Sequence, residues 1–201
     1  MTGSAPAGWH GDAFEAALEA VLHTPRLRLE PQAEHHAEGL FEPLGDARLY
    51  THIPQEPPAS LQALRERLAR LSARRSPQGD ELWLNWVLCD AQSDAYIGRV
   101  QATVRGDAPA YLAYEVFPAF WQQGYATEAC IRMIRWLIDD LHIEHFSAEV
   151  DSLNTASLRL LERLGFRRVA LRANADHFKG RSSDEWLLRL AAAEFARERA
   201  T

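Results

Sequence analysis

The segment from Ala126 to Leu141 constrains the fold of this chain more than any other part of its sequence. Apolar residues recur there at intervals of three and four positions, at Ala126, Ala129, Cys130, Met133, Ile134, Leu137, Ile138 and Leu141. This spacing is typical of an amphipathic helix with one face on a core. A Gly-containing loop ending at Gly124 precedes it. We therefore expect a long helix that begins directly after this loop.

Hydrophobic patterning elsewhere predicts further helices and strands. Before the long helix we expect a short helix at Asp12 to Leu22, a strand at Arg26 to Glu30, and helices at Gln32 to Leu49 and Ala59 to Arg74. An antiparallel meander is expected at Leu82 to Cys89, Tyr96 to Arg105 and Ala110 to Phe117. After the long helix the patterns predict a strand at Phe146 to Val150 and a helix at Thr155 to Leu164 that ends at Gly165. Two further strands are expected at Phe166 to Arg172 and Asp184 to Leu190, joined by a polar loop. A short helix or tail is expected at Ala191 to Ala200.

Length and composition fit one globular domain and exclude several classes of protein. With 201 residues, 47% hydrophobic and 25% charged, the chain can bury one sizeable core. A formal net charge of −6 gives no general attraction to nucleic acid or anionic membrane. No apolar stretch approaches the roughly 20 residues that span a bilayer, and residues 1–11 do not resemble a secretion signal. Cys89 and Cys130 lie in apolar runs, which favours buried thiols in a reducing compartment. We expect a cytoplasmic protein that binds neither nucleic acid nor membrane.

The loop before the long helix carries the first chemical signal. The first N–H groups of a helix lack partners within it and carry partial positive charge, so a Gly-containing loop that enters a helix can hold a pyrophosphate. Gly124 would let the backbone approach the phosphates. A single glycine before a helix is also an ordinary turn, so this segment alone leaves both interpretations open. Because the chain has neither a P-loop nor G-x-G-x-x-G, a nucleotide hydrolase is disfavoured.

Three motifs occur in a fixed order along the chain. They are Thr24-Pro25-Arg26-Leu27-Arg28-Leu29, then Trp121-Gln122-Gln123-Gly124-Tyr125-Ala126-Thr127-Glu128-Ala129, and finally Asn154-Thr155-Ala156-Ser157 with Leu164-Gly165-Phe166. With these motifs the chain resembles the GNAT superfamily of acetyl-CoA-dependent N-acetyltransferases, over roughly residues 24–190. The nearest resemblance is to the type that acetylates ribosomal-protein N-termini. The sequence departs from that type at Gln122, where Gly is common, and Trp121 replaces the Arg or Gln of other superfamily members.

The resemblance implies an α/β (α+β) fold of three layers. A central mixed, mostly antiparallel sheet would be flanked by helices, and its strands at Ala110 to Phe117 and Phe146 to Val150 would splay apart. The domain would cover 24–190, after a tail and extra helix at 1–23 and before a helix or tail at 191–201. Acetyl-CoA would place its pantetheine arm in the splay, where unpaired N–H groups near Val116 and Phe117 could bind its amides and polarise the thioester. The implied coenzyme contacts are Val116, Phe117, Gln122, Gln123, Gly124, Tyr125, Ala126, Thr127, Asn154 and Ser157.

Acetyl transfer to an amine requires a base for the amine proton and a partner for the departing thiolate. Glu149 and Glu115, on the two central strands, are the candidates for the base, and each could equally be a solvated strand residue. Ser157 is the candidate thiolate partner, because the Tyr that many superfamily members use four positions later is Leu161 here. The alternative for Ser157 is a backbone contact in its helix. Asn154 could be only an N-cap, and Glu128 is expected to complement the helix dipole.

Other residue clusters have simpler interpretations. His35-His36 and His142-x-x-His145 lack an H-E-x-x-H pattern and a nearby Cys, so we expect no metal. Core positions are expected for Trp83, Trp86 and Trp136. The basic stretch is interpreted as a solvated helix face that could also steer an acidic substrate; it comprises Arg65, Arg67, Arg70, Arg74 and Arg75.

The function predicted from the sequence is acetyl transfer from acetyl-CoA to a primary amine, by direct attack in a ternary complex. A protein N-terminus, a Lys side chain, a small amine and an aminoglycoside all remain open as acceptors. The alternative is a non-catalytic coenzyme-A-binding sensor or regulatory module. We expect the acceptor pocket among Gln32 to Arg75 and the Ala173 to Ser183 loop. A homodimer is also expected, through the sheet edge or an apolar N-terminal face of Phe14, Leu18, Val21 and Leu22.

Overall fold

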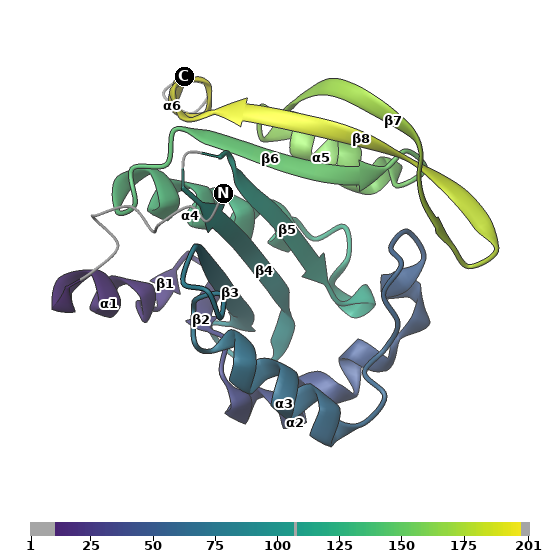
Figure 1. Ribbon diagram of the computed structural model, residues 1–201. Helices are drawn as coiled ribbons and strands as arrows, with labels where there is room; N and C mark the ends of the chain where they lie inside the picture. Colours follow the sequence, from purple (N-terminus) through teal and green to yellow (C-terminus); the bar gives the residue numbers. More distant parts are fainter. Residues whose placement is uncertain (1–10, 107, 198–201) are drawn as a thin grey trace.

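An eight-stranded sheet in the order β1-β2-β3-β4-β5-β6-β8-β7 organises the chain in the computed structural model, which describes residues 11–106 and 108–197 (Figure 1). The strands are β1 (Leu22–His23), β2 (Leu27–Pro31), β3 (Glu81–Asp90), β4 (Tyr96–Arg105), β5 (Ala110–Val116), β6 (His145–Asp151), β7 (Arg167–Phe178) and β8 (Arg181–Ala191). Neighbouring strands are antiparallel except β5 and β6, which are parallel.

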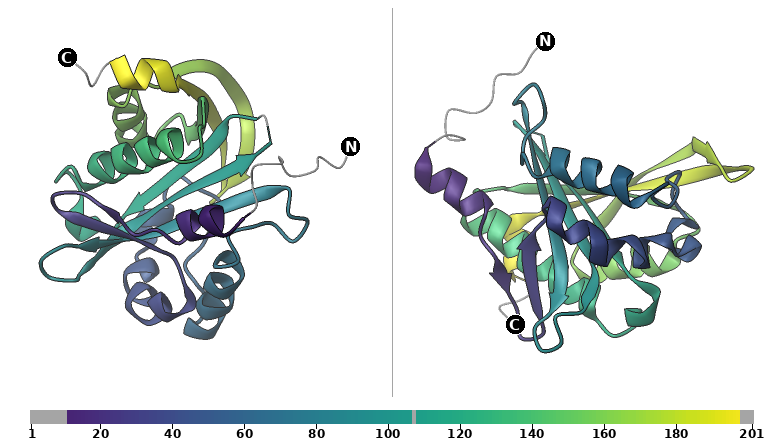
Figure 2. Two further views of the ribbon diagram at one scale, coloured as in Figure 1. Left: turned by 90° about the vertical axis from the view of Figure 1, so that its left-hand side faces the viewer. Right: turned by 90° about the horizontal axis from the view of Figure 1, so that it is seen from below.

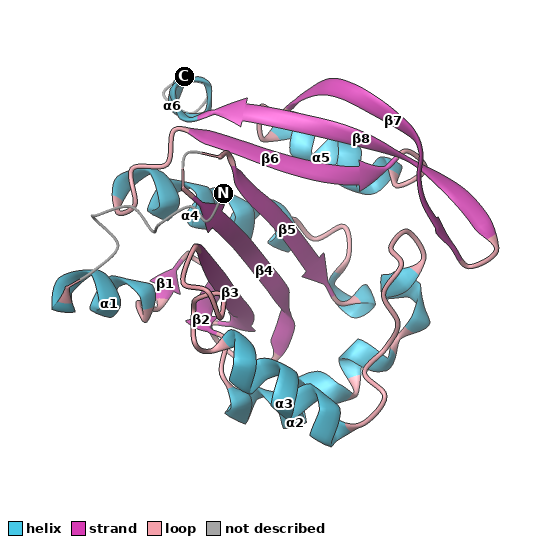
Figure 3. Ribbon diagram, viewed as in Figure 1, coloured by secondary structure: helices cyan, strands magenta, loops and turns pink. Residues whose placement is uncertain are grey.

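Helices flank this sheet, which confirms the predicted α/β fold (Figure 3). The helices are α1 (Asp12–Leu18), α2 (Ala37–Phe41), α3 (Leu61–Leu71), α4 (Tyr125–Asp139), α5 (Thr155–Arg163) and α6 (Ala192–Arg197). Short 3-10 turns lie at Glu34–His36, Pro43–Gly45, Ala47–Tyr50 and Pro118–Phe120. Within the described part of the chain, no helix has both the length and the apolar character to cross a bilayer.

The core lies on both faces of the sheet because successive strand residues point to opposite sides. On β3, Trp86 and Leu88 belong to the larger cluster, which includes α4 and α5, whereas Val87 and Cys89 pack with α2 and α3. The predicted long helix is confirmed as α4, and its Trp136 meets Trp86 edge-on at 5.4 Å between ring centroids. Figure 2 shows the helices on either side of the sheet.

The N-terminal helix is shorter than predicted, and its apolar face is already covered. Helix α1 ends at Leu18, and Leu22 belongs to strand β1 rather than to a helix. Leu18 and Leu22 are 2% and 1% exposed in the main core, while Val21 is 44% exposed. The continuous apolar face that suggested a dimer contact therefore packs largely on the chain's own sheet.

The prediction of a single helix at Gln32 to Leu49 is wrong. This segment is divided into 3-10 turns and the short helix α2, because Pro43 cannot donate the next helical hydrogen bond. Helix α3 is shorter than predicted and begins after Ser60, whose Oγ accepts from the Ala63 N–H at 3.1 Å. Arg74 lies beyond it, is 4% exposed and donates to the Gln32 carbonyl at 2.8 Å, so the predicted solvated arginine face excludes this residue.

The polar loop predicted between the last two strands is instead part of a long hairpin. Strands β7 and β8 continue to a tight turn at Lys179 and Gly180, both with positive φ, as this kind of hairpin turn requires. The hairpin projects beyond the end of β6 (Figure 1). At its tip, Lys179 Nζ donates to the carbonyls of Ile53 and Gln55 at 3.0 and 3.1 Å, which ties the hairpin to the Pro-rich loop before α3.

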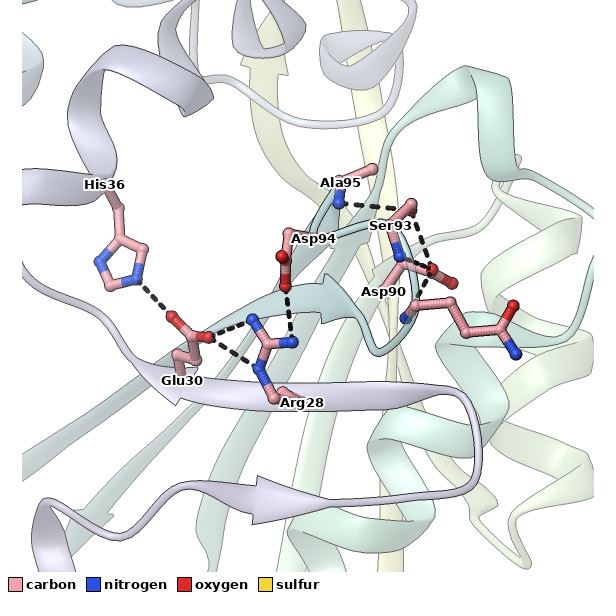
Figure 4. Close-up of polar contacts among 8 residues, drawn as sticks. Arg28, Glu30, His36, Asp90, Ser93, Asp94 and Ala95 are labelled. Carbon is pink, nitrogen blue, oxygen red and sulfur yellow. Dashed lines mark hydrogen bonds and ion pairs between the residues drawn. The ribbon is translucent and has the colours of Figure 1, made fainter.

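A polar network holds the opposite edge of the sheet (Figure 4). Arg28 on β2 contacts Glu30 at 2.8 Å and Asp94 in the β3–β4 turn at 2.7 Å. Glu30 also lies 3.3 Å from Nε2 of His36. Burial lowers the pKa of the His36 imidazole, although the Glu30 carboxylate partly opposes this. These contacts fix β2 against the β3–β4 turn and the short turns that precede α2.

Gly98 on β4 is required by the close approach of β5. A Cβ atom at this position would lie 2.1 Å from the Glu115 carbonyl oxygen and 2.8 Å from the Val116 Cα. We expect Gly98→Ala to force these strands apart and lower the free energy of unfolding by about 1–3 kcal/mol. Urea denaturation measures the change. Gly45→Ala is the control, because no atom lies within 4 Å of a Cβ there, and an equal loss in both variants would contradict the explanation.

Candidate active site

The parallel strands β5 and β6 separate after a short region of contact. They pair only at Ala110–Phe146 and Tyr111–Ser147, and beyond these positions the two ribbons diverge (Figure 1). The splay opens a cavity of about 390 Å³ between β4 and β5 on one side and β6 on the other. Residues from α3, from the loop before it and from the β7–β8 hairpin also line the cavity.

The backbone at the end of β5 differs in part from the expectation. The Phe117 N–H donates to the Ile97 carbonyl at 2.8 Å, so the prediction that it is unpaired is wrong. Because successive peptide groups of a strand point in opposite directions, the peptide groups of Val116 face away from β4, toward the splay. The Val116 carbonyl accepts from Trp121 Nε1 at 2.5 Å. Of the two expected oxyanion donors, only the Val116 N–H points toward the cavity side of β5.

The loop before α4 has an unusual backbone. Gln122 and Gly124 have φ values of 60° and 83°, both in the left-handed region that favours glycine. This geometry explains why Gly is common at the position of Gln122. Gly124 is the N-cap of α4, and no side chain caps the helix there. Gln123, Tyr125, Ala126 and Thr127 surround this helix start, whose first N–H groups point out of the helix end.

The first motif binds directly to the second. Thr24 Oγ1 donates to Glu128 Oε1 at 2.6 Å, and the Arg26 backbone N–H and Nε donate to the same carboxylate at 3.0 and 2.6 Å. Arg26 also donates to the Gln123 carbonyl at 2.9 Å. Glu128 therefore anchors the loop and the start of α4, a role that its position near the helix dipole did not reveal. Burial raises the pKa of the Glu128 carboxyl, but the hydrogen bonds from Thr24 and Arg26 outweigh it, and the net pKa is lowered.

The third motif positions a hydroxyl pair in the cavity. The Asn154 side chain accepts from the Ser157 N–H at 3.1 Å, which confirms the N-cap interpretation. Ser157 Oγ lies 2.7 Å from the Tyr114 hydroxyl, and both residues line the cavity. Burial raises the pKa of the Tyr114 phenol far above its ordinary value, so it stays protonated at neutral pH. Sequence patterns missed Tyr114, because nothing in β5 indicates that this side chain meets α5.

Both carboxylates considered as the base line the cavity, and both are ion-paired. Glu115 accepts from Arg99 on β4, with 2.8 Å between its Oε1 and Nη2. Glu149 pairs through Oε1 with Arg172 of β7. Both hydrogen bonds from Arg99 to Glu115 reach Oε1, which leaves Oε2 of Glu115 for another partner.

Asp151 and His52 also line the cavity. Asp151 is 5% exposed and accepts from Arg181 at 2.5 Å, Ser183 at 2.7 Å and the Leu153 N–H at 2.7 Å. Burial raises the pKa of its carboxyl, but these hydrogen bonds outweigh it and the pKa is lowered. His52 Nδ1 lies 3.8 Å from Asp151. The Asp151 contacts fix the end of β6 to β8 beside the cavity.

Neither cysteine belongs to the cavity. Cys89 and Cys130 are buried in the core, as predicted, and burial raises the pKa of each thiol to about 12. Within residues 11–106 and 108–197, no three His, Cys, Asp or Glu side chains gather closely enough to hold a metal ion.

Comparisons with known proteins agree with this geometry. Residues 26–167 match the model of the acetyltransferase (GNAT) domain. The chain is 21% identical over 150 residues to the uncharacterized N-acetyltransferase YoaA of Bacillus subtilis, which covers 74% of this chain and 83% of that protein.

Two solved structures share the fold. Spermidine N-acetyltransferase from Vibrio cholerae, in complex with CoA and spermine, superposes with a TM-score of 0.73 at 18% identity, covering 86% of this chain and 99% of that one. The ribosomal L7/L12 α-N-protein acetyltransferase RimL, in complex with coenzyme A, has a TM-score of 0.74 at 15% identity, covering 86% and 98%.

The contact between the first and second motifs predicts a pH-dependent stability. Because the folded pKa of Glu128 lies below its ordinary value of 4.5, its charge stabilises the fold above that pH, and the contribution disappears as pH falls through the folded pKa. We expect Glu128→Gln to lower the free energy of unfolding by about 1–3 kcal/mol at pH 7. The difference from wild type should shrink below pH 4.5.

Chemical denaturation between pH 7 and pH 3 measures this difference. Glu162→Gln is the control, because Glu162 forms a more exposed ion pair with Arg168, with side-chain exposures of 43% and 37%, and such pairs contribute only about 0–1 kcal/mol. A Glu128→Gln loss that stays constant across this pH range would show that the carboxylate charge is not responsible.

Proposed function

We propose that this chain, which belongs to the GNAT acetyltransferase family, transfers the acetyl group of acetyl-CoA to a primary amine by direct attack in a ternary complex. The acceptor would be a peptide N-terminus or a small amine. The observation that carries this proposal is the splay of β5 and β6, because one cavity contains the hydroxyl pair of Ser157 and Tyr114 and both candidate bases, Glu149 and Glu115.

Acetyl-CoA would use both the helix start and the splay. The uncapped N–H groups after Gly124 favour the pyrophosphate, since a helix N-terminus carries partial positive charge. The pantetheine arm would then run toward the cavity, where the Val116 N–H is directed. Phe117 would contribute packing rather than a backbone donor, because its N–H belongs to the sheet.

Glu149 is our first candidate for the base, and Glu115 is the second. An α-amine has an ordinary pKa of about 7.7–8.0, so a fraction is neutral at pH 7 and a modest base can take the proton released on attack. Glu149 would accept this proton, while Arg172, which pairs with its Oε1, holds the carboxylate in place. Water would then carry the proton out of the open cavity.

Ser157 and Tyr114 would stabilise the leaving thiolate. A thiol has an ordinary pKa near 8.5, below that of a tyrosine, so the thiolate accepts a hydrogen bond here rather than removing the tyrosine proton. If Tyr114 donates to Ser157 Oγ, the serine proton is free to point at the sulfur. The hydroxyl pair thus supplies the partner that Leu161, 2% exposed and without a polar group, cannot supply.

Direct attack is favoured over a covalent acetyl-enzyme. The two cysteines are buried outside the cavity and their thiols remain protonated at neutral pH. Within the described residues the Ser157 hydroxyl has the Tyr114 hydroxyl as its partner, which is not a base that could activate it as a nucleophile.

Coenzyme binding is tested through stability. At a hundredfold excess over its dissociation constant, acetyl-CoA should add about 2.7 kcal/mol to the free energy of unfolding, and the melting temperature should rise by several degrees. We expect Gly124→Glu to weaken this binding strongly, because its carboxylate would crowd and repel the pyrophosphate. Gly79→Glu is the control with a similar backbone, at φ 74° and with no atom within 4 Å of a Cβ. The absence of any acetyl-CoA effect on wild type would refute the proposal.

The base assignment predicts a separation between binding and turnover. We expect Glu149→Gln to lower kcat by roughly 10²–10⁴-fold while leaving the acetyl-CoA dissociation constant nearly unchanged. Its activity should recover as pH rises toward the pKa of the acceptor amine. Glu81→Gln, which removes an ion-pair carboxylate outside the cavity, should retain wild-type kcat.

The same kinetics distinguish the alternatives. If Glu115→Gln loses kcat while Glu149→Gln keeps it, Glu115 is the base. If both variants keep wild-type kcat, water removes the proton. Tyr114→Phe and Ser157→Ala should lower kcat without the pH recovery, because they act on the sulfur. If wild type binds acetyl-CoA but acetylates no amine or peptide in a mass-spectrometric panel, the chain is a coenzyme-binding sensor.

A further inference from the structure

The two walls of the cavity carry opposite charge. On the wall formed by α3, β4 and β5, the charged groups are Arg67, Arg99 and Glu115, and only one of the two guanidinium groups has a carboxylate partner. On the wall formed by β6 and the β7–β8 hairpin, four carboxylates line the cavity, at Glu149, Asp151, Asp176 and Glu185. Two arginines, Arg172 and Arg181, offset them. The wall formed by α3, β4 and β5 therefore carries a net positive charge, and the wall formed by β6 and the hairpin carries a net negative charge.

Arg67 is the unusual member of the cationic wall. Its side chain lines the cavity, and in the described residues no carboxylate lies within ion-pair distance of it. Arg65, on the same helix, pairs with Glu38 at 2.5 Å. Burial lowers the pKa of Arg67, and the charge of nearby Arg99 lowers it further, while Glu115 opposes this. Two neighbouring guanidinium groups with one nearby carboxylate leave a net positive charge here, which would attract an anion that enters the cavity.

The opposite wall suits a cation. Arg172 lies between Glu149 and Glu185, pairing with the first and standing 3.7 Å from the second. Asp176 lines the same wall with no cation within ion-pair distance in the described residues. Burial raises the pKa of Glu185, and the charge of Glu149 adds to this effect. An ammonium group entering here would lie beside Glu149, the candidate base.

We propose that the acceptor is dipolar, with a carboxylate close to the primary amine that is acetylated; this proposal rests on the proposed function. Arg67 binds the carboxylate, with Arg99 beside it, and the acidic wall receives the amine. A guanidinium suits this role because its planar fork binds a carboxylate through two parallel hydrogen bonds. A diamine of similar length fits worse, because it would place its second cation beside Arg67.

Two acceptors share this chemistry and can be distinguished. One is a free amino acid with its carboxylate a few bonds from the amine. The other is a peptide whose first side chain is Asp or Glu. Both present an ammonium and a carboxylate to the two walls, so both satisfy the proposal, and matched amides remove the negative charge while preserving the shape.

The experiment is isothermal titration calorimetry on the full chain saturated with coenzyme A, which cannot donate an acetyl group. The probes are 4-aminobutyrate, 4-aminobutyramide and 1,4-diaminobutane, together with a series of ω-amino acids from glycine to 6-aminohexanoate. A pair of peptides that begin with Asp or Asn forms the second arm. We expect at least one carboxylate probe to bind roughly tenfold or more tightly than its matched amide, and the diamine to bind more weakly than the best amino acid.

Variants locate the effect. Arg67→Met should remove the preference for the carboxylate, and Arg67→Lys should keep part of it because the charge remains but the fork is lost. Arg70→Met is the matched control, on the same helix but outside the residues that line the cavity. Circular dichroism and the acetyl-CoA dissociation constant show whether each variant stays folded.

The proposal is overturned if amide or diamine probes bind as tightly as the carboxylates, if no probe binds, or if Arg67→Met keeps the preference. Turnover of the same panel with acetyl-CoA tests the proposed function separately. A carboxylate preference without acetylation would support the dipolar acceptor site and contradict the transferase function. Acetylation without a carboxylate preference would support the transferase function and contradict the dipolar acceptor site.

Discussion

The early end of pairing between β5 and β6 is the constraint on which the rest of this structure depends. Both strands are held by their outer neighbours. The Phe117 N–H at the end of β5 donates to the Ile97 carbonyl of β4, and β6 pairs with β8 from His145 to Asp151. Gly98 permits the close approach that keeps β5 on β4. Beyond Tyr111 and Ser147 the inner edges therefore do not pair with each other. Unpaired backbone groups are costly unless water or a ligand satisfies them. A sheet divided in this way leaves a cavity between its two halves as a consequence of its topology.

The three sequence motifs each fix one boundary of this opening. The first motif holds the carboxylate of Glu128, and through it the start of α4. The second contributes Trp121, whose indole donates to the Val116 carbonyl at the end of β5. The third places Ser157 against Tyr114 on the same strand. Residues far apart in the chain are thus connected around the cavity, which explains why the motifs occur together.

The proposed acceptor side is built from less distinctive sequence. Lys179 at the tip of the hairpin binds carbonyl groups of Ile53 and Gln55, and so joins the C-terminal strands to the loop before α3. Between these segments lie the cationic and acidic walls. A shared fold does not fix the substrate, because substrate choice depends on the side chains of the site, which differ from one function to another.

The sequence by itself determined the elements whose patterns are local. The apolar repeat predicted α4, the alternating runs predicted the meander, and the motifs predicted the family. Only the tertiary structure decided the break in the helix predicted at Gln32 to Leu49, the continuous hairpin in place of a polar loop, the sheet hydrogen bond of Phe117 and the arginine partners of both candidate bases. Periodicity records which face of an element is buried. It does not record which distant side chain lies opposite, and Tyr114 and Ser157, separated by 43 positions, meet only when the sheet has formed.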